Sequence, residues 1–220
     1  MLSNDKILKI ISMTDHTLLS PAATQFDVAE LCNEAEKFGA ASVCVPPCFV
    51  EFASNYSTNI DVCTVIGFPN GYNTRNTKIL ESLDAIRCGA TELDMVINIG
   101  MLKSGNYEGV LEEINAVKEI CEYRILKVII EACLLTQDEK IKMCQIISES
   151  NADFVKTSTG FSLSGASQSD VALFKKHLTN GKKIKAAGGI KTFEQADQFI
   201  ELGADRIGSS SLLKIAGEKL

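Results

Sequence analysis

The strongest constraint on the fold of this chain is an unbroken alternation of short apolar runs and longer amphipathic stretches. The apolar runs predict strands, and the stretches with apolar residues at helical spacing predict helices. The predicted strands are residues 11–15, 42–45, 61–66, 92–97, 126–130, 154–156, 183–186 and 206–208. The clearest predicted helices are residues 26–38, 77–88, 107–121, 137–150 and 193–201. This alternation is typical of an α/β protein with a parallel sheet.

The number of repeats favours a closed barrel over an open sheet. Eight strands and about eight helices in 220 residues fit a single-domain (β/α)8 TIM barrel over residues 1–220. The alternative is a doubly wound open sheet, which is disfavoured because no Gly-x-Gly-x-x-Gly motif follows the first predicted strand. Three helices end on glycine followed by alanine, at 39–40, 89–90 and 203–204, as expected for repeated helix–strand units.

The composition excludes several classes of protein. A net charge of −6 argues against a nucleic-acid or anionic-membrane surface. No apolar run approaches the ~20 residues that span a bilayer, and the first residues do not resemble a signal peptide. We therefore expect a soluble cytoplasmic protein. The 8 cysteines are predicted to be free thiols, and with only His16 and His177 a histidine metal site is nearly excluded.

Four charged residues stand out because they lie within otherwise apolar predicted strands. They are Asp94, Lys127, Lys156 and Lys185. The spacings between them are 33, 29 and 29 residues, and each corresponds to about one strand plus one helix. Burying one such charge costs several kcal/mol unless partners offset it. Since active sites of TIM barrels lie at the C-terminal ends of the strands, we expect all four residues at these ends.

The parity of the fourth predicted strand supports an interior position for its carboxylate. Alternate residues of a strand face opposite sides, so Asp94 shares a face with Glu92 and Val96. The apolar residues between them are suited to packing under helices. Asp94 is therefore predicted to face the barrel interior.

The lysines indicate amine chemistry. Burial lowers the pKa of an amine, and a second ammonium group on the adjacent strand, about 4.8 Å away, lowers it further. Lys156 and Lys185 are expected to stand in this relationship, and a neutral lysine is the nucleophile that forms a Schiff base with a carbonyl. Asp94 would relay protons, or would neutralise Lys127 or Lys185. The alternative, solvated lysines and a structural aspartate, does not explain matched positions in consecutive units.

Three loops after the last predicted strands indicate a phosphate site. In TIM barrels, phosphate usually lies near the loops after strands seven and eight, at a helix N-terminus. The alternative is ordinary turn chemistry, because glycine and serine are common in loops. The candidate loops are residues 157–160, 186–189 and 208–211.

These motifs, in this order, resemble those of the deoxyribose-phosphate aldolase family of the bacterial DeoC type. The resemblance runs from about residue 11 to 211 and includes Lys-Thr-Ser-Thr-Gly at 156–160 and Lys-Ala-Ala-Gly-Gly at 185–189. Other matching motifs are Asp-His-Thr-Leu-Leu at 15–19, Val-Cys-Val at 43–45, Val-Ile-Gly-Phe-Pro at 65–69, Glu-Leu-Asp-Met-Val-Ile-Asn-Ile-Gly at 92–100 and Arg-Ile-Gly-Ser-Ser at 206–210.

The resemblance implies a class I aldolase that reversibly cleaves 2-deoxy-D-ribose 5-phosphate to acetaldehyde and D-glyceraldehyde 3-phosphate, without metal or cofactor. It implies that Lys156 forms the Schiff base, that Lys185 perturbs it and that Asp94 is the proton-transfer acid/base. Lys127 matches a further pocket lysine, paired with Asp15 or Asp94. Six loop residues match the phosphate cradle of the family: Thr159, Gly160, Gly188, Gly189, Ser209 and Ser210. The implied partner is the sugar phosphate. Barrels of this kind often dimerise, so a homodimer is one expected assembly.

The chain departs from the family pattern at several positions. The family has lysine, asparagine, histidine and threonine where this chain has Ser20, Pro46, Asn70 and Ala132. Ser20 and Pro46 are expected near the barrel mouth, where their exchange would affect phosphate or acceptor contacts. The last tyrosine is Tyr123, so the chain lacks the C-terminal tyrosine of longer members. Cys44 is expected to be a buried thiol rather than a pocket residue.

Two other functions remain as alternatives. One is a sister Schiff-base barrel, such as a transaldolase or another sugar-phosphate aldolase, with the same lysine and phosphate site. The other is a phosphate-binding barrel that has lost catalysis, which retention of Asp94, Lys156 and Lys185 argues against. A metal-dependent aldolase is the least favoured, because the histidines are two and far apart.

Overall fold

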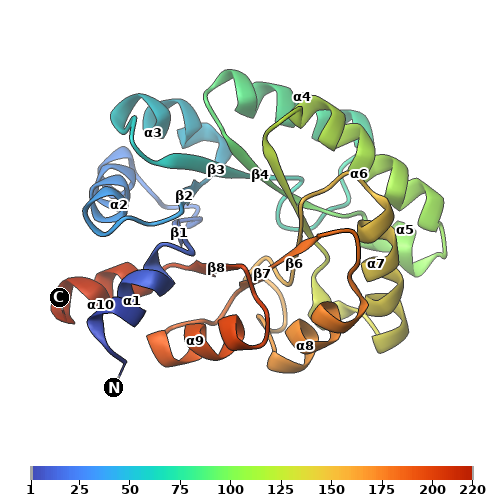
Figure 1. Cartoon of the computed structure of the whole chain (residues 1–220). Helices are drawn as coiled ribbons and strands as arrows, with labels where there is room; N and C mark the ends of the chain where they lie inside the picture. The colour runs from blue at the N-terminus through green and yellow to red at the C-terminus, as the bar shows by residue number, and fades with distance from the viewer. Residues whose placement is uncertain (1, 220) are drawn as a thin grey trace.

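The chain forms a closed barrel of eight parallel strands in sequence order, surrounded by helices (Figure 1). The computed structural model describes residues 2–219. The strands are β1 Thr14–Thr17, β2 Ser42–Val45, β3 Asp61–Ile66, β4 Glu92–Val96, β5 Ile125–Ile129, β6 Phe154–Lys156, β7 Lys183–Ala187 and β8 Arg206–Ser209. Since β8 pairs with β1, the barrel has no open edge. The predicted (β/α)8 fold is confirmed.

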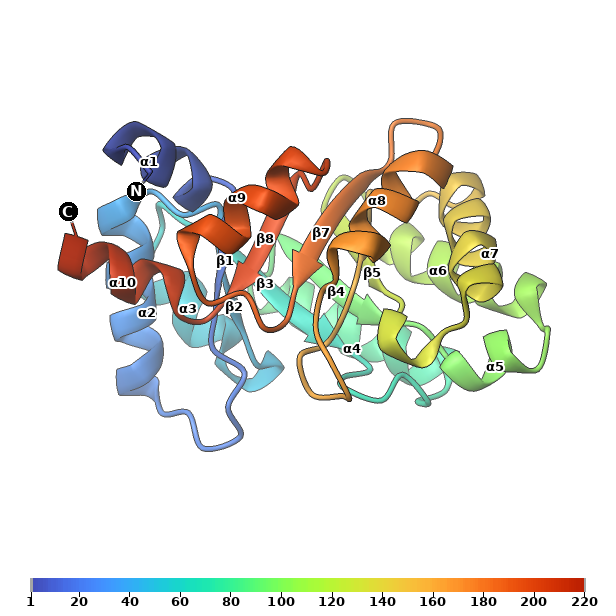
Figure 2. The same cartoon turned by 90° about the horizontal axis from the view of Figure 1, so that it is seen from below.

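The helices lie outside the strands and connect them (Figure 2). They are α1 Asn4–Ile11, α2 Gln25–Phe38, α3 Val50–Tyr56, α4 Arg75–Arg87, α5 Ile99–Lys103, α6 Tyr107–Cys121, α7 Gln137–Glu149, α8 Gln168–His177, α9 Phe193–Glu201 and α10 Leu212–Lys219, with short 3₁₀ turns η1 Pro47–Phe49 and η2 Ala132–Leu134. Threonine or serine caps begin α2, α4, α7, α8 and α9, as expected for helix N-termini. None of the helices between residues 2 and 219 is long and apolar enough to span a membrane.

The first predicted strand was placed too early in the sequence. Residue 11 ends α1 instead, and β1 begins at Thr14. The side chain of Ser3 caps the helix, and its buried face consists of Ile7, Ile10 and Ile11. This spacing is helical rather than alternating, so the packing of α1 on the barrel determines the structure of the segment.

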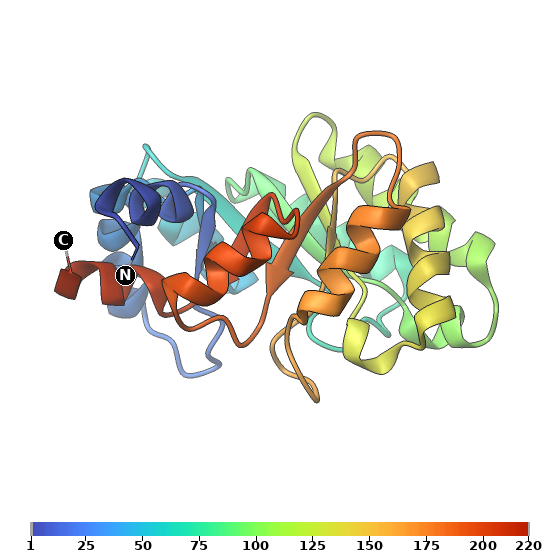
Figure 3. The same ribbon diagram turned by 60° about the horizontal axis from the view of Figure 1, so that its bottom comes forward.

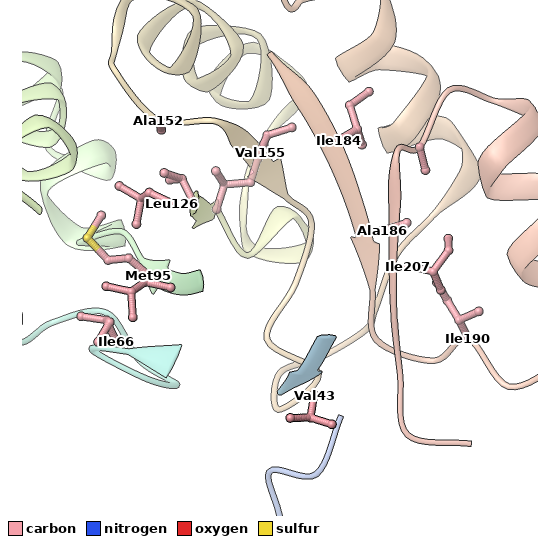
Figure 4. Packing of buried hydrophobic residues seen from close by; sticks show 14 of the residues in the cluster. Val43, Ile66, Met95, Leu126, Ala152, Val155, Ile184, Ala186, Ile190 and Ile207 are labelled. Atoms are coloured by element: carbon pink, nitrogen blue, oxygen red, sulfur yellow. The ribbon is translucent and has the colours of Figure 1, made fainter. Parts of the chain in front are cut away.

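The main apolar core fills the space between the strands and the helices (Figure 4). Leu93, Met95 and Ile97 belong to this outer core, as their parity predicted, whereas Glu92 and Asp94 face inward. Fully burying one Leu, Ile or Met side chain contributes about 1.5–3 kcal/mol. The outer core therefore stabilises the fold and leaves the barrel interior free for polar groups.

A buried ion pair outside the barrel connects α4, α6 and the end of β4. The Lys78 ammonium lies 2.9 Å from the Glu113 carboxylate and donates to the Val96 carbonyl oxygen at 2.8 Å. Glu113 also accepts the backbone N–H of Asn98 at 3.0 Å. Because both charged side chains are buried, this pair fixes the outer helices against the strand that carries Asp94.

The loops after the C-terminal ends of the strands gather at one mouth of the barrel. Figure 3 shows the loop before α8 and the loop before α2 projecting on the same side of the molecule. Residues of both loops line one cavity, together with residues that follow β7 and β8. The fold therefore brings the predicted phosphate loops together at the mouth.

Candidate active site

Only one of the four singled-out charged residues ends its strand. Lys156 is the last residue of β6, whereas Asp94, Lys127 and Lys185 are the middle residues of β4, β5 and β7. The expectation that all four lie at strand ends was wrong. The cause is strand length, because β6 has 3 residues and the other three strands have 5. Lys156 pairs in register with Lys185, but β6 ends there, whereas the strands that carry the other three charged residues continue beyond them.

The Asp94 carboxylate lies at the centre of the site and contacts all three lysines. Its Oδ2 atom accepts the Lys156 ammonium at 2.7 Å and the Lys185 ammonium at 2.6 Å. Its Oδ1 atom accepts the Lys127 ammonium at 2.9 Å and lies 3.3 Å from the Cys63 sulfur. The predicted cluster of one carboxylate and three lysines is therefore formed.

Two further carboxylates and an arginine extend this cluster toward the bottom of the barrel. Asp15 binds the Lys185 ammonium and lies 3.6 Å from that of Lys127, and it accepts Arg206 at 2.5 Å. Glu92 lies 2.6 Å from the Lys127 ammonium and 3.1 Å from the Arg206 guanidinium. Lys127 therefore contacts both of its predicted partners, Asp15 and Asp94.

The ion pairs outweigh the effect of burial on the protonation of these groups. Burial alone would raise the pKa of Asp94, but Lys127, Lys156 and Lys185 hold that pKa well below its usual range. Burial likewise opposes ionisation of Asp15, but Lys185, Lys127 and Arg206 lower its pKa. Conversely, the pKa of Lys185 is raised, because Asp15 and Asp94 more than offset its burial. Asp94 and Asp15 are therefore held ionised, with Lys185 protonated.

Lys156 is the one ammonium of this cluster that reaches open space. It is 3% exposed, whereas Lys127 and Lys185 are completely buried. Lys156 lines a cavity of about 390 Å³ at the mouth of the barrel. The other lining residues are Thr17, Leu18, Leu19, Ser20, Thr159, Gly160, Phe161, Ala187, Gly188, Gly189, Ile190, Lys191, Gly208, Ser209 and Ser210. A small molecule in this cavity would therefore meet the Lys156 amine.

All six predicted phosphate-loop residues line the same cavity. Gly188 needs its glycine backbone, because its φ is +87° and a Cβ there would lie 2.9 Å from the Cα of Gly165. The Ser209 hydroxyl donates to the Ile190 carbonyl at 2.8 Å, while Ser210 is exposed. The N-terminus of α10 follows these serines, so its unpaired N–H groups suit an anion.

A glycine in β8 makes room for the lysine cluster. A Cβ on Gly208 would lie 3.2 Å from the Cε atom of Lys185 and 2.8 Å from the Cβ of Ala187. A side chain at this position would clash with Ala187 and press on the Lys185 side chain. Glycine at position 208 therefore fits the close packing beside Lys185.

The positions that depart from the family pattern lie in different environments. Ser20 lines the cavity, as expected from its place near the mouth. Pro46, Asn70 and Ala132 do not contribute to its lining: Pro46 precedes η1, Asn70 donates to the Tyr72 hydroxyl at 2.9 Å, and Ala132 is buried in η2. Of these four exchanges, the one at Ser20 is therefore placed to contact a ligand directly.

Two buried groups of donor atoms have the proximity that a metal ion requires. One consists of Cys44, Cys63 and Asp94, and the other of Asp15, Cys63 and Glu92. Their carboxylates already bind lysine or arginine, and burial is the main cause that raises the pKa of Cys63 well above its usual value. Cys44 is completely buried, which agrees with a buried thiol. The expectation of a metal-free reaction stays a prediction.

Sequence reasoning missed several polar residues of the site. Arg206 and Glu92 complete the ion-pair cluster, Lys191 lines the cavity, and Glu131 contacts Thr159. Glu92 had a usable signal, because it shares the inward face of β4 with Asp94. Lys191 follows the predicted glycine loop, so its place at the cavity could also have been inferred.

Comparison of the sequence with known proteins finds aldolases, both among family models and among individual proteins. The family described as DeoC/LacD family aldolase matches residues 9–217. A deoxyribose-phosphate aldolase from Thermoanaerobacter sp. (strain X514) is 50% identical over 216 residues, covering 96% of this chain and 97% of that protein.

Solved structures show the same similarity. One described as "QR15, an Aldolase" has a TM-score of 0.92 and 39% identity, and the match covers 96% of this chain and 95% of that one. The deoxyribose phosphate aldolase from Aeropyrum pernix, described as tetrameric, has a TM-score of 0.86 and 30% identity over 100% of both chains.

Proposed function

The chain belongs to the DeoC/LacD family of aldolases, and we propose that it reversibly cleaves 2-deoxy-D-ribose 5-phosphate to acetaldehyde and D-glyceraldehyde 3-phosphate. The observation that carries this proposal is that a single carboxylate, Asp94, binds three buried lysines of which only Lys156 lines the mouth cavity. This arrangement supports Schiff-base chemistry at Lys156.

The charges of the barrel interior support Lys156 as the nucleophile. Four cationic side chains face three carboxylates, so the fully ionised cluster has one positive charge in excess. Within the ion pairs described, Lys127 contacts three carboxylates and Lys185 two, whereas Lys156 contacts Asp94 alone. Lys156 is therefore the lysine of this cluster with the fewest carboxylate partners, and its amine is the proposed nucleophile that attacks a carbonyl.

We propose that the reaction uses these groups in the following order. The Lys156 amine attacks the C1 aldehyde of the open-chain sugar, and loss of water gives the imine. Protonation of the imine nitrogen gives an iminium ion. Removal of the proton from the C3 hydroxyl then breaks the C2–C3 bond, and the electron pair of that bond passes to the iminium ion, which becomes a neutral enamine. D-Glyceraldehyde 3-phosphate leaves, C2 is protonated, and hydrolysis of the imine releases acetaldehyde and the amine. Asp94, within hydrogen-bond reach of Lys156, is the proposed acid/base, either directly or through one water.

The other end of the cavity suits the phosphate. Gly188, Gly189 and Ser210 bring backbone and hydroxyl groups to the cavity near the N-terminus of α10. Lys191 adds a cation on the same side. We infer that the phosphate binds here and that the sugar extends from it toward Lys156.

Borohydride trapping tests the proposed nucleophile directly. The protein is incubated with 2-deoxyribose 5-phosphate and borohydride, with EDTA present, and its peptides are analysed by mass spectrometry. A stable adduct on Lys156 would support both the imine mechanism and its independence of metal. Lys156→Ala serves as the matched control and should give no adduct. An adduct elsewhere, or none from protein that binds the sugar phosphate, would overturn the assignment.

The assembly and the compartment are separate proposals. We propose a homodimer in the cytoplasm, whereas the related aldolase from Aeropyrum pernix is described as tetrameric; light scattering would distinguish the two oligomeric states. A single species with the mass of a tetramer or of a monomer would contradict the homodimer.

A further inference from the structure

Glu131 is a buried acidic residue in an unusual backbone conformation, and the proposed mechanism does not use it. It follows β5, is 2% exposed and has a φ of 48° and a ψ of 63°. Within residues 2–219, the other non-glycine residues with positive φ are Glu122 and Asn180, and both are exposed. Left-handed backbone at a non-glycine residue costs free energy and tends to persist where the surrounding structure requires it.

The carboxyl group of Glu131 binds one residue of the loop that follows β6. The backbone N–H of Thr159 donates to both carboxyl oxygens at 3.3 Å, and the Thr159 hydroxyl donates to Oε2 over a short distance. The sulfur of Cys133 lies 3.8 Å from Oε1. Across the part of the chain that the structure describes, no lysine, arginine or histidine forms an ion pair with Glu131. Burial of an acidic group without a cation is costly, so stability alone does not explain its presence.

The loop that Glu131 holds is the one that begins at the proposed nucleophile. The N–H of Ile130 donates to the Lys156 carbonyl at 3.1 Å, and that of Ala132 donates to the Thr157 carbonyl at 2.8 Å. Glu131, between these two donors, adds the side-chain contact to Thr159. Its position therefore fixes the direction in which the chain leaves Lys156.

Thr159 passes this constraint to the wall of the cavity. Its hydroxyl accepts the backbone N–H of Phe161 at 3.0 Å, and Thr159, Gly160 and Phe161 all line the cavity. The ring of Phe161 packs edge-on against Phe68, with centroids 5.3 Å apart. One carboxyl group therefore orders three consecutive cavity residues.

We propose that Glu131 is a positioning residue for the aldolase reaction, acting through its hydrogen bonds to Thr159. The proposal rests on the proposed function, because the loop it orders lies between the Schiff-base lysine and the phosphate end of the cavity. It also changes the role of Thr159. The amide and hydroxyl of Thr159 are occupied by Glu131, so this residue orients the loop, and the phosphate contacts fall to Gly160 and the loops after β7 and β8.

Three variants separate positioning by hydrogen bonds from other roles. Glu131→Ala removes the acceptor, whereas Glu131→Gln keeps a carbonyl oxygen that accepts from Thr159. Glu122→Ala is the matched control, because it removes another glutamate of positive φ that is exposed, at the turn between α6 and β5. The readouts are kcat and KM for 2-deoxyribose 5-phosphate and for unphosphorylated 2-deoxyribose.

A misplaced loop should affect both the chemistry and the binding of the phosphorylated sugar. We expect kcat/KM for 2-deoxyribose 5-phosphate to fall about 100-fold in Glu131→Ala, since displacements near 1 Å have effects of this order. The loss should be smaller for unphosphorylated 2-deoxyribose. Glu131→Gln should recover most of the activity, and Glu122→Ala should match the wild type. Equal losses in Glu131→Gln and Glu131→Ala would overturn the proposal, because the carboxyl charge or proton would then be what matters.

A double-mutant cycle tests the named partner. If Glu131 acts through Thr159, adding Thr159→Val to Glu131→Ala should cause little further loss of kcat/KM. Multiplied losses would show that the two residues act separately, and would overturn the proposed route.

Hydrogen exchange tests the same contact without reference to activity. Amides of residues 157–163 should exchange faster in Glu131→Ala than in the wild type or in Glu122→Ala. Unchanged exchange of these amides in Glu131→Ala would overturn the positioning role, whatever the activity of the enzyme. If the wild type shows neither turnover nor imine trapping, the proposed function fails, and the exchange measurement still decides whether Glu131 orders the loop.

Discussion

Lys156 and Lys185 donate to the same oxygen atom of Asp94, at 2.7 and 2.6 Å, from register-paired positions of β6 and β7. The two lysines therefore do not simply repel each other across the barrel, because a carboxylate lies between them. Lys185 is also bound by Asp15, which leaves Lys156 as the amine with a single counterion and a free path to the cavity.

Asp94→Asn should reduce both stability and turnover. The change preserves shape but leaves Lys127, Lys156 and Lys185 without their shared counterion. We expect the free energy of unfolding to fall by about 3–5 kcal/mol and kcat to fall about 10²–10⁴-fold through loss of acid/base catalysis. Urea unfolding and steady-state kinetics measure the two effects. Asp61→Asn, at an exposed carboxylate on β3, is the control. Normal turnover in a folded Asp94→Asn protein would contradict the assigned role.

Ser210→Asp should discriminate against the phosphorylated sugar. Ser210 is exposed at the cavity beside the N-terminus of α10, so a new carboxylate would repel a phosphate and compete for the same N–H groups. We expect KM for 2-deoxyribose 5-phosphate to rise at least about tenfold, corresponding to roughly 1.4 kcal/mol. KM for unphosphorylated 2-deoxyribose should change little. Equal changes for both sugars would remove Ser210 from the phosphate site.

Lys78→Met should destabilise the protein without involving the active site. It leaves Glu113 buried beside the end of β4 without its cation. We expect the free energy of unfolding to fall by about 3–5 kcal/mol. The double variant Lys78→Met/Glu113→Gln should recover part of this loss, because glutamine keeps an acceptor for the N–H of Asn98. Urea unfolding measures both, and a single variant as stable as the wild type would show that the pair contributes nothing.

His16 should make stability depend on pH below neutrality. Burial lowers the pKa of His16 from the usual 6.5, although Glu34 opposes this shift. Between the folded-state pKa and 6.5 the unfolded chain binds more protons, so stability rises with pH in this window. The contribution is complete above pH 6.5 and is lost as the pH falls below that value.

Unfolding at pH 7.5 and 5.5 tests this sign. The wild type should lose more stability between the two pH values than His16→Gln does. His177→Gln, which changes the histidine of α8, should behave as the wild type. A larger loss in His16→Gln than in the wild type would mean that His16 is stabilised in its charged form.

The sequence was sufficient to predict the bounds of elements whose apolar pattern is strong. The bounds of β3 and α6 agree with the prediction, because the buried run of β3 and the helical apolar spacing of α6 are continuous over their lengths. The segment around Ile11 failed, because three isoleucines near one another suit a strand or a helix until their packing partners are known. Tertiary contacts with the barrel decided it.

The site was predictable where chemistry and strand parity coincided. Asp94, Lys156 and Lys185 were found because charges within apolar runs need partners, and the barrel brings them together. The position of each residue along the barrel axis was not predicted, since it depends on strand length and register. Glu131 was missed because its partner, Thr159, is 28 residues away and joins it only across two adjacent strands. Arg206 begins β8, where a charged residue is also common at a surface.

The ion-pair cluster inside the barrel limits how this sequence can evolve. Seven side chains from six strands share their counterions. Replacing one of them leaves a partner without its counterion, and a side chain on a neighbouring strand must change to compensate. Substitutions here should show strong epistasis: Asp15→Asn would be more readily tolerated in a background where Arg206 has already been lost than in the present one. Homologues are therefore expected to drift freely in the outer faces of the helices, while the interior changes only in coordinated, charge-conserving steps.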